Sequence, residues 1–285
     1  LRDIECADPY IDDIIIGSRG DTDEELLRNH ARDVRRVLQT LKDNVLVCSP
    51  KKSHFFMRQV EFCGHILREG SRSPAPGKLI PIQQWQLPKT ITELRGFLGL
   101  CNYFSEYVPH YADFAGPLSE LLKVGRADGA KGSKKPVAWT PETVEAFEKL
   151  KSKLAQELEL FRLDPDRPFV MRCDASDFAI GAVLEQAHPD EDLTAQIDID
   201  KTRLVPVSFF SRKLTGSQLN WTPREKETYA IVAALRKWAG HVGFQPVIVA
   251  TDHRSLQHWV TEHVDTPSGP RGRRARWHET LSQFD

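Results

Sequence analysis

Hydrophobic and polar positions follow a helical period in the first half of the chain and a strand-like rhythm in the second. Residues 24–43 repeat apolar side chains every three or four positions, which predicts an amphipathic helix. The apolar face would carry Leu27, Ala31, Val34, Leu38 and Leu41. Two short apolar runs, "NVLVC" and "VEFCGHIL", then favour strands. The breaker-rich stretch "SRSPAPGK" marks a predicted boundary.

The next part of the chain is predicted to be helical. In "TITELRGFLGLCNYFSEYV", Thr90 and Glu93 have the spacing of a capping box. The apolar stripe of this segment comprises Leu94, Phe97, Leu98, Cys101 and Tyr107. The stretch "GRADGAKGSKKP" is typical of a flexible linker. After it, Thr140 is expected to cap a further helix that begins with Pro141.

From residue 168 the rhythm changes to that of strands. The runs "PFVMRCD", "AIGAVLEQ" and "LVPVSFFS" each favour a strand, and residues 222–238 favour a helix. A further strand, "PVIVATD", precedes the short helical segment "HRSLQHWV". The order β-β-β-α-β-α predicts a mixed sheet with helices packed on it, so the fold class is α/β (α+β).

Composition narrows the class of protein only moderately. The chain is 40% hydrophobic and 28% charged, with a net charge of −1, as in ordinary globular proteins. No apolar run approaches the roughly 18 residues of a membrane helix, so no membrane association is expected. Five scattered cysteines without zinc spacing favour a reducing, intracellular location. Residues 28–58 and 201–285 are locally basic, which fits either solvated surfaces or grooves that follow phosphates.

Three acidic residues are poorly explained by packing alone. Asp174 and Asp252 each follow an apolar, strand-like run, where a sheet can aim polar groups into a shared cleft. Glu227 lies on the same helical face as the apolar positions 231, 234, 235 and 238, and a buried carboxylate is costly without a partner. Its neighbour Glu225 has a local role instead, because it completes a capping box with Thr222.

Three converging carboxylates require a cation, because like charges would otherwise raise some of their pKa values. Mg²⁺ prefers oxygen ligands and binds phosphate, and two such ions about 4 Å apart can promote phosphodiester hydrolysis. The alternative from spacing alone is three separate, solvated acids in turns. The spacing leaves both interpretations open.

An ordered series of motifs resembles a known family. The matching segments are "YIDDIIIGS", "PKKSHFF", "VEFCGHIL", "LRGFLGLCNYFSEYVPHYADFAGPLSELL", "WTPETVEAFEKLK", "RCDASDFAIGAVLEQ", "VSFFSRKL", "REKETYAIVAAL" and "TDHRSLQHW". Together they resemble the end of the reverse transcriptase and the ribonuclease H region of a Ty3/gypsy-type retrotransposon polyprotein. The resemblance implies a palm remnant at 1–72, a helical thumb with connecting helices at 73–165, and a C-terminally truncated ribonuclease H-like domain at 166–285.

The resemblance also implies roles for individual residues. Asp12 and Asp13 match the metal-binding aspartates of the palm hairpin, although Pro9 argues against a regular interior strand there. Gly64 and His65 would form the tip of the hairpin that positions the primer terminus. The ribonuclease H carboxylates would be Asp174, Glu227 and Asp252, holding two Mg²⁺ or Mn²⁺ ions.

Two departures from the family pattern keep several functions open. The family uses a further palm aspartate upstream of Asp12, and a fourth ribonuclease H group beyond "SQFD". The main hypothesis is a metal-dependent nuclease that cuts RNA in RNA–DNA hybrids, with Arg212, Lys213 and the arginines of residues 271–276 as candidate phosphate contacts. The alternatives are a polymerase piece that is inactive alone, or a decayed or domesticated remnant that only binds nucleic acid.

The expected partners follow from these hypotheses. They are RNA–DNA hybrid, primer–template nucleic acid and the remaining parts of a polyprotein. Within the cell, a cytoplasmic particle and the nucleus remain equally open as locations.

Overall fold

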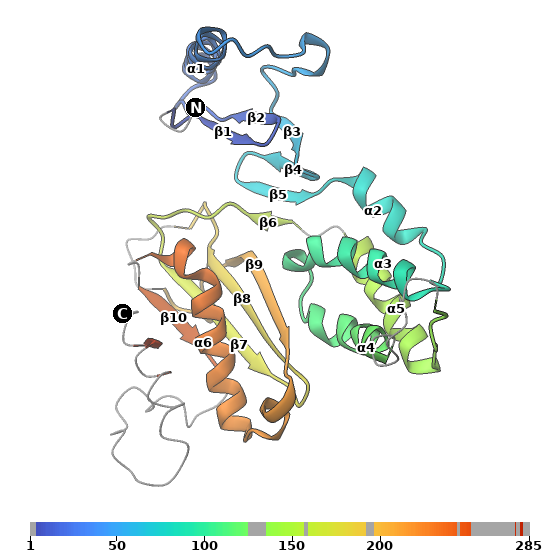
Figure 1. Cartoon of the computed structure of the whole chain (residues 1–285). Coiled ribbons are helices and arrows are strands. Elements are labelled where there is room, and N and C mark those ends of the chain that lie inside the picture. The colour runs from blue at the N-terminus through green and yellow to red at the C-terminus, as the bar shows by residue number, and fades with distance from the viewer. Residues whose placement is uncertain are drawn as a thin grey trace. The chain divides into compact units, whose positions relative to one another are not determined.

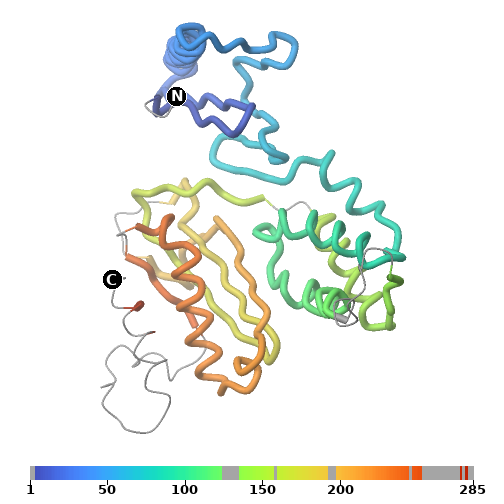
Figure 2. Tube along the Cα trace, in the orientation of Figure 1, coloured from blue at the N-terminus to red at the C-terminus, as the bar shows by residue number. Residues whose placement is uncertain are grey.

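A computed structural model describes the chain at residues 4–124, 135–156, 159–191, 197–243, 246–251, 277, 280 and 281. The chain divides into two compact units, Leu1–Glu69 and Gly70–Asp285, called unit 1 and unit 2 below. Figure 1 labels the elements, and Figure 2 traces the path of the chain through them. The predicted domain boundaries near residues 72 and 165 stay predictions.

Unit 1 contains two hairpins and one long helix. The hairpins are β1 (Ala7–Tyr10) with β2 (Asp13–Ile16), and β3 (Gln59–Phe62) with β4 (His65–Arg68). Helix α1 spans Asp23–Asp43, and the short 3-10 helix η1 spans Pro50–Lys52. Thr22 caps α1 by accepting a hydrogen bond from the Glu25 backbone N–H at 3.2 Å.

The buried face of α1 differs from the predicted one. Val34, Val37 and Leu41 are buried, whereas Leu27 is 55% exposed and Leu38 is 40% exposed. The helix packs its narrow apolar stripe on the β1–β2 hairpin and Ile4, and such a small surface covers only one side of the predicted face. The predicted strand in "NVLVC" is also wrong. Val45 has a left-handed φ of 61° and the run carries no strand, so an apolar run without a neighbouring strand stays irregular.

Pro9 lies inside β1, opposite Ile14. The Gly17 backbone N–H donates to the Cys6 carbonyl at 2.9 Å, which identifies that pair as hydrogen-bonded. Hydrogen-bonded and non-hydrogen-bonded pairs alternate along an antiparallel ladder, so the Pro9–Ile14 pair carries no ladder bond. The missing donor of Pro9 is therefore tolerated in this two-stranded hairpin.

The first part of unit 2 is a helical layer. Its helices are α2 (Pro76–Gln83), α3 (Ile91–Tyr103), η2 (Ser105–Tyr107), α4 (Tyr111–Val124) and α5 (Pro141–Ala155). Strand β5 (Ser71–Pro74) precedes these helices in the sequence and strand β6 (Leu160–Phe161) follows them. The two strands pair antiparallel with each other. The predicted apolar stripe is buried, with Leu94, Phe97, Leu98 and Cys101 on α3 and Tyr107 on η2, because α3 ends at Tyr103. The predicted caps Thr90 and Thr140 are confirmed. Most of the predicted linker, residues 125–134, lies outside the described residues.

Among its described residues, the second part of unit 2 forms a four-stranded mixed sheet in the order β10-β7-β8-β9. Its elements are β7 (Phe169–Ala175), β8 (Ala179–Ala187), β9 (Leu204–Lys213), the 3-10 helix η3 (Gly216–Asn220), α6 (Pro223–Val242) and β10 (Val247–Ala250). Strands β7, β8 and β9 are antiparallel neighbours, and β10 runs parallel to β7. Helix α6 covers one face of the sheet (Figure 1). The predicted mixed sheet is confirmed, and the predicted short helix from His253 lies outside the described residues.

The two faces of the sheet contact different layers. Phe169, Met171 and Cys173 join the core beneath α6, so the alternate residues of β7 point to the other face. On that other face, the Ala112 backbone N–H of α4 donates to Ser211 Oγ of β9 at 3.0 Å. The Lys213 ammonium bonds Glu120 Oε1 of α4 at 2.6 Å. The helical layer is thus docked on the sheet opposite α6.

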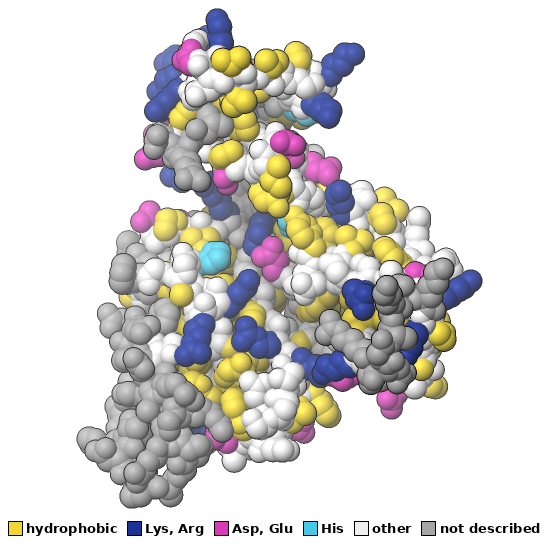
Figure 3. Space-filling view, in the orientation of Figure 1, with side chains coloured by type: hydrophobic (Ala, Val, Ile, Leu, Met, Phe, Trp, Pro, Cys, Tyr) yellow, Lys and Arg dark blue, Asp and Glu magenta, His cyan; other side chains and the backbone are white. Residues whose placement is uncertain are grey.

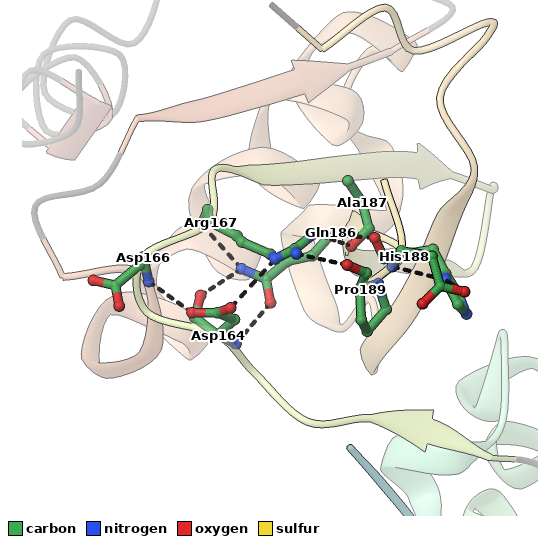
Figure 4. Close-up of polar contacts among 8 residues, drawn as sticks. Asp164, Asp166, Arg167, Gln186, Ala187, His188 and Pro189 are labelled. Atoms are coloured by element: carbon green, nitrogen blue, oxygen red, sulfur yellow. Dashed lines mark hydrogen bonds and ion pairs between the residues drawn. The ribbon is translucent and has the colours of Figure 1, made fainter. Parts of the chain in front are cut away.

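The side chains of Gln186 and Arg167 form a network of hydrogen bonds, called the clasp of Gln186 below, around the segment that leads into β7 (Figure 4). The Gln186 side chain accepts from the Asp164 backbone N–H at 3.0 Å and donates to the carbonyls of Asp164 and Arg167 at 2.8 and 3.0 Å. The Arg167 guanidinium donates to the carbonyls of His188 and Pro189 at 3.0 and 2.8 Å. Gln186 is only 3% exposed, and these bonds join the segment before β7 to the end of β8.

No helix among the described residues combines the length and apolar character that crossing a membrane requires.

Candidate metal and nucleic-acid site

Asp174 lies near the end of β7, with Gly181 of β8 as its ladder partner. Its side chain is exposed and, by the alternation of the strand, points to the face opposite α6. An exposed carboxylate near the end of a central strand is open to a ligand from solvent. Its place near the end of a strand agrees with the sequence, and the shared cleft with Glu227 and Asp252 stays a prediction.

In helix α6, Glu225 and Glu227 have the different surroundings that the sequence predicts. The Glu225 carboxylate accepts from the Thr222 backbone N–H at 3.0 Å, and Thr222 Oγ1 accepts from the Glu225 N–H at 3.3 Å, which completes the capping box. Glu227 is 7% exposed, on the side of the helix that packs on the sheet. The prediction that Glu227 is core-facing is confirmed.

The charges of both carboxylates affect one thiol. Cys173, which is 6% exposed, lies next to Asp174 in β7. Its pKa is raised first by burial, and then by the negative charges of Glu227 and Asp174. Glu227 reaches Cys173 from the helix that covers its face of the sheet, whereas Asp174 is its neighbour in the strand and points to the other face.

The helical layer also reaches this point. A Cβ placed on Gly181 would lie 3.1 Å from His110 Nδ1 and 3.4 Å from His110 Cε1, so the imidazole packs directly on the ladder partner of Asp174. The pKa of the Asp113 carboxyl is raised overall. Partial burial is the largest cause, the charge of Asp174 adds to it, and His110 opposes it. Residues of α4 and the loop before it are thus neighbours of Asp174.

Two of the three predicted metal ligands are described, and their chemistry fits a hard cation. Carboxylate oxygens are the ligands that Mg²⁺ prefers, and Asp174 and Glu227 supply them from adjoining elements. Asp252 lies outside the described residues, two positions after the end of β10. Within the described ranges, no cluster of three or more His, Cys, Asp or Glu side chains able to hold a metal ion is found.

The other predicted carboxylate pair lies in the β1–β2 turn of unit 1. Asp12 is a turn residue and Asp13 begins β2, and both are exposed. Ile11 adopts a left-handed φ of 54°, which is strained for a β-branched residue. Strained turn residues of this kind cluster at functional sites.

The tip of the β3–β4 hairpin is shifted by one residue from the prediction. Cys63 and Gly64 form the turn, with φ of 50° and 80°, whereas His65 is already the first residue of β4. Two consecutive positive φ angles are typical of a type I′ turn, and this fixes the shift. The pKa of the Cys63 thiol is raised by desolvation and then by the charges of Asp13 and Asp8, so this tip lies near the carboxylates of the first hairpin.

Comparisons with known proteins agree with this geometry. Residues 164–284 match the family model of the RNase H-like domain found in reverse transcriptase. Over 281 residues, 97% of the chain, it is 32% identical to the Transposon Tf2-3 polyprotein of Schizosaccharomyces pombe. The resemblance to Ty3/gypsy-type retrotransposon polyproteins is confirmed. The chain spans 19% of the length of that polyprotein.

Solved structures show the same fold. The foamy viral protease–reverse transcriptase bound to RNA/DNA hybrid superposes with a TM-score of 0.76 and 22% identity, covering 100% of this chain and 36% of that one. A second structure, of the foamy viral protease–reverse transcriptase dRH with double-stranded DNA, gives a TM-score of 0.77 at 22% identity, covering 100% and 46%. The chain therefore shares its fold with these structures.

The predicted phosphate contacts Arg212 and Lys213 lie on opposite faces of β9. Arg212 is on the α6 face, where its guanidinium lies over the Phe210 ring at 5.3 Å and donates to the Tyr229 hydroxyl at 3.4 Å. Lys213 is on the face of the helical layer, bound to Glu120. The structure does not bring the two side chains together, and Lys213 already neutralises a carboxylate. The predicted arginine cluster at 271–276 lies outside the described residues.

Exposed basic side chains also cover the outer side of α1. Figure 3 shows several Lys and Arg side chains projecting at the top of the view. The exposed basic residues of α1 are Arg28, Arg32, Arg35, Arg36 and Lys42. All five side chains are exposed, within the stretch 28–58 that the sequence identifies as locally basic.

Sequence reasoning missed Lys226, His110 and Asp113 as neighbours of the site. Lys226 lies four residues before the buried Ala230, so the helical phase that identified Glu227 also contained the signal for Lys226. His110 and Asp113 carry no comparable signal. Their closeness to Asp174 depends on how α4 docks on the sheet.

Proposed function

We propose that unit 2 hydrolyses the RNA strand of RNA–DNA hybrids in a reaction that requires Mg²⁺ or Mn²⁺. The observation that carries the proposal is geometric: Asp174 is exposed near the end of β7, and the bond from Lys226 to Asp177 holds the first turns of α6, which contain the buried Glu227, next to the turn after that strand. The foamy viral relative bound to an RNA/DNA hybrid supports the choice of substrate.

Asp174, Glu227 and Asp252 would hold the ions through their carboxylate oxygens. When bound, two divalent ions activate a water for attack on phosphorus and stabilise the leaving oxygen. Glu227 is held by a packed helix, so its carboxylate keeps its orientation between turnovers. Asp174 is exposed, so a scissile phosphate can approach it from solvent. The 2′-hydroxyl would distinguish RNA from DNA.

Cleavage of a labelled hybrid by the 285-residue chain tests this proposal. RNA in the hybrid should be cut only with Mg²⁺ or Mn²⁺, and duplex DNA should be spared. Asp174→Asn should abolish cleavage while hybrid binding stays similar, because the fold and the basic side chains remain. The matched control is Asp200→Asn, which changes an exposed loop carboxylate and should leave cleavage intact. Cleavage by Asp174→Asn at the wild-type rate would refute the assignment.

A second proposal concerns unit 1. We infer that Asp12 and Asp13 contribute to a polymerase site, supported by their exposure, by the strained Ile11 and by the nearness of the Cys63–Gly64 turn. Binding of Mn²⁺ by the full chain carrying Asp174→Asn tests this, because the proposed site of unit 2 is then disabled. The remaining binding should weaken when Asp12→Asn is added, and not when Asp21→Asn is added, since Asp21 is an exposed acid of the following loop.

A further inference from the structure

A lysine is buried beside Glu227. Lys226 is 5% exposed in the first turns of α6. An ammonium group removed from water is costly unless it is paired and hydrogen-bonded. The position of Lys226 therefore depends on a specific partner.

That partner is the turn that follows Asp174. Lys226 Nζ lies 3.1 Å from Asp177 Oδ1 and 3.3 Å from the Asp177 carbonyl oxygen. Asp177 belongs to the connection between β7 and β8, three positions after Asp174. One side chain thus joins the helix of Glu227 to the turn beyond Asp174.

The turn is itself rigidly bonded. The Ser176 backbone N–H donates to the Ala179 carbonyl at 2.8 Å, and Ser176 Oγ accepts from the Ala179 N–H at 3.0 Å. A displacement of Asp177 would therefore also displace the end of β7. This makes the contact between Lys226 and Asp177 a link between two elements that each carry a proposed ligand.

The two partners of this ion pair differ in exposure. The Asp177 side chain is 84% exposed, whereas that of Lys226 is 7% exposed, so the carboxylate keeps most of its hydration. Buried ion pairs can often be replaced by apolar side chains of similar volume without loss of stability. What an apolar replacement cannot supply is the directed bond to the turn.

We propose that Lys226 is a positioning residue, whose bond to Asp177 fixes the carboxylates of Asp174 and Glu227 relative to one another. This inference rests on the proposed metal-dependent function. Lys226 would contact neither the ions nor the substrate. It would act through the turn and the helix.

The direction in which metal affinity changes when Lys226 is replaced shows whether this residue positions the ligands or acts only through its charge. An ammonium near the carboxylates repels cations, so its removal should tighten metal binding if charge were its only effect. If Lys226 holds the two ligands in place, its removal should weaken metal binding. The two explanations predict opposite results for the same variant.

The experiment is a titration of the full 285-residue chain with Mn²⁺, following free Mn²⁺ by electron paramagnetic resonance. Lys226→Met keeps the side-chain length and should raise the dissociation constant about threefold to tenfold, near the low end of losses from removing support at metal sites. The control is Lys149→Met, which removes an exposed lysine paired with Glu145 on α5 and should change nothing. Thermal unfolding of each variant checks that it is folded.

A second variant covers the case in which Lys226→Met does not fold. Asp177→Asn changes an exposed side chain and weakens the same link. It should also raise the dissociation constant, and the increase should persist in 0.5 M KCl, where the Debye length is only a few ångströms and distant charge effects are screened (about 3 Å at 1 M).

The outcomes distinguish a failure of the proposed metal site from a failure of the positioning role of Lys226. Unchanged Mn²⁺ binding in Asp174→Asn would overturn the proposed metal site itself. Weaker binding in Asp174→Asn together with unchanged or tighter binding in Lys226→Met would overturn only the positioning role. If Lys226→Met is unfolded, wild-type binding by Asp177→Asn in 0.5 M KCl would overturn it equally.

Discussion

Among single residues, Glu225 and Glu227 are two positions apart and have separate tasks. Glu225 completes the capping box of α6, and Glu227 is buried against the sheet. Glu225→Ala should cost about 0.5–1 kcal/mol of stability, since it removes one half of the cap. Glu227→Gln should retain the fold and lose Mn²⁺ binding and hybrid cleavage. Thermal unfolding and the two functional assays on both variants test this, and equal loss of cleavage from both, with both folded, would contradict it.

The contact between Gly181 and His110 offers a second test at the same scale. An alanine at 181 would meet the imidazole at 3.1 Å, closer than an ordinary van der Waals contact. Gly181→Ala should therefore destabilise unit 2 by about 1–3 kcal/mol, as overpacking usually does. Chemical denaturation measures the loss.

The partner of this contact provides the control. His110 has a left-handed φ of 53°, which glycine adopts without strain. His110→Gly should relieve the clash, so the double variant should be more stable than the sum of the single changes predicts. Additive losses would mean that the imidazole does not oppose the new methyl group. Gly99→Ala, on the exposed side of α3 with open space around it, should instead not destabilise the chain.

At the scale of elements, the clasp of Gln186 is the sharpest target. Gln186→Leu keeps a similar volume but leaves the backbone groups of Asp164 and Arg167 without their bonds. Stability of unit 2 should fall by about 1–3 kcal/mol, the usual cost of stranding buried polar groups. Urea denaturation followed by tryptophan fluorescence measures it. Gln83→Leu, at an exposed position of α2, is the control and should change stability little.

The elements also show what the sequence could and could not predict. The sequence predicts the buried face of α6 correctly because a long helix with a dense apolar stripe can face a sheet in only one way. The burial of Glu227 follows from that face. The phase of α1 was misread because its apolar residues surround more of the helix than the small β1–β2 hairpin covers. "NVLVC" was misread because a short apolar run becomes a strand only where a partner strand exists. The closeness of His110 to Asp174 joins distant parts of the chain, and no local pattern contains it.

For the whole molecule, the two units differ greatly in the size of their cores. Among the described residues, the buried cluster of unit 1 consists of Ile4, Val37 and Leu41. Unit 2 contains two larger clusters, one in the helical layer and one beneath α6. A small core leaves a unit marginally stable, because less of its surface is buried on folding.

We therefore expect two unfolding transitions, with unit 1 unfolding at the lower temperature. Cys63→Asn suits the left-handed turn position better and should raise only the lower transition. Gln186→Leu should lower only the upper one. Differential scanning calorimetry of both variants is the measurement, and a single transition that moves with either substitution would contradict the expectation.

The buried thiols of unit 2 can report when each of its two cores opens. Cys101 is fully buried in the helical layer, where burial raises its pKa to about 12, and Cys173 is buried beneath α6 with a raised pKa. Because the thiolate is the reactive form, a thiol reagent will modify either residue only while its core is open. Cys6, Cys48 and Cys63 of unit 1 are only partly buried and will react early. The order and rate of labelling at Cys101 and Cys173 will therefore time the opening of each core of unit 2 in the unmodified chain.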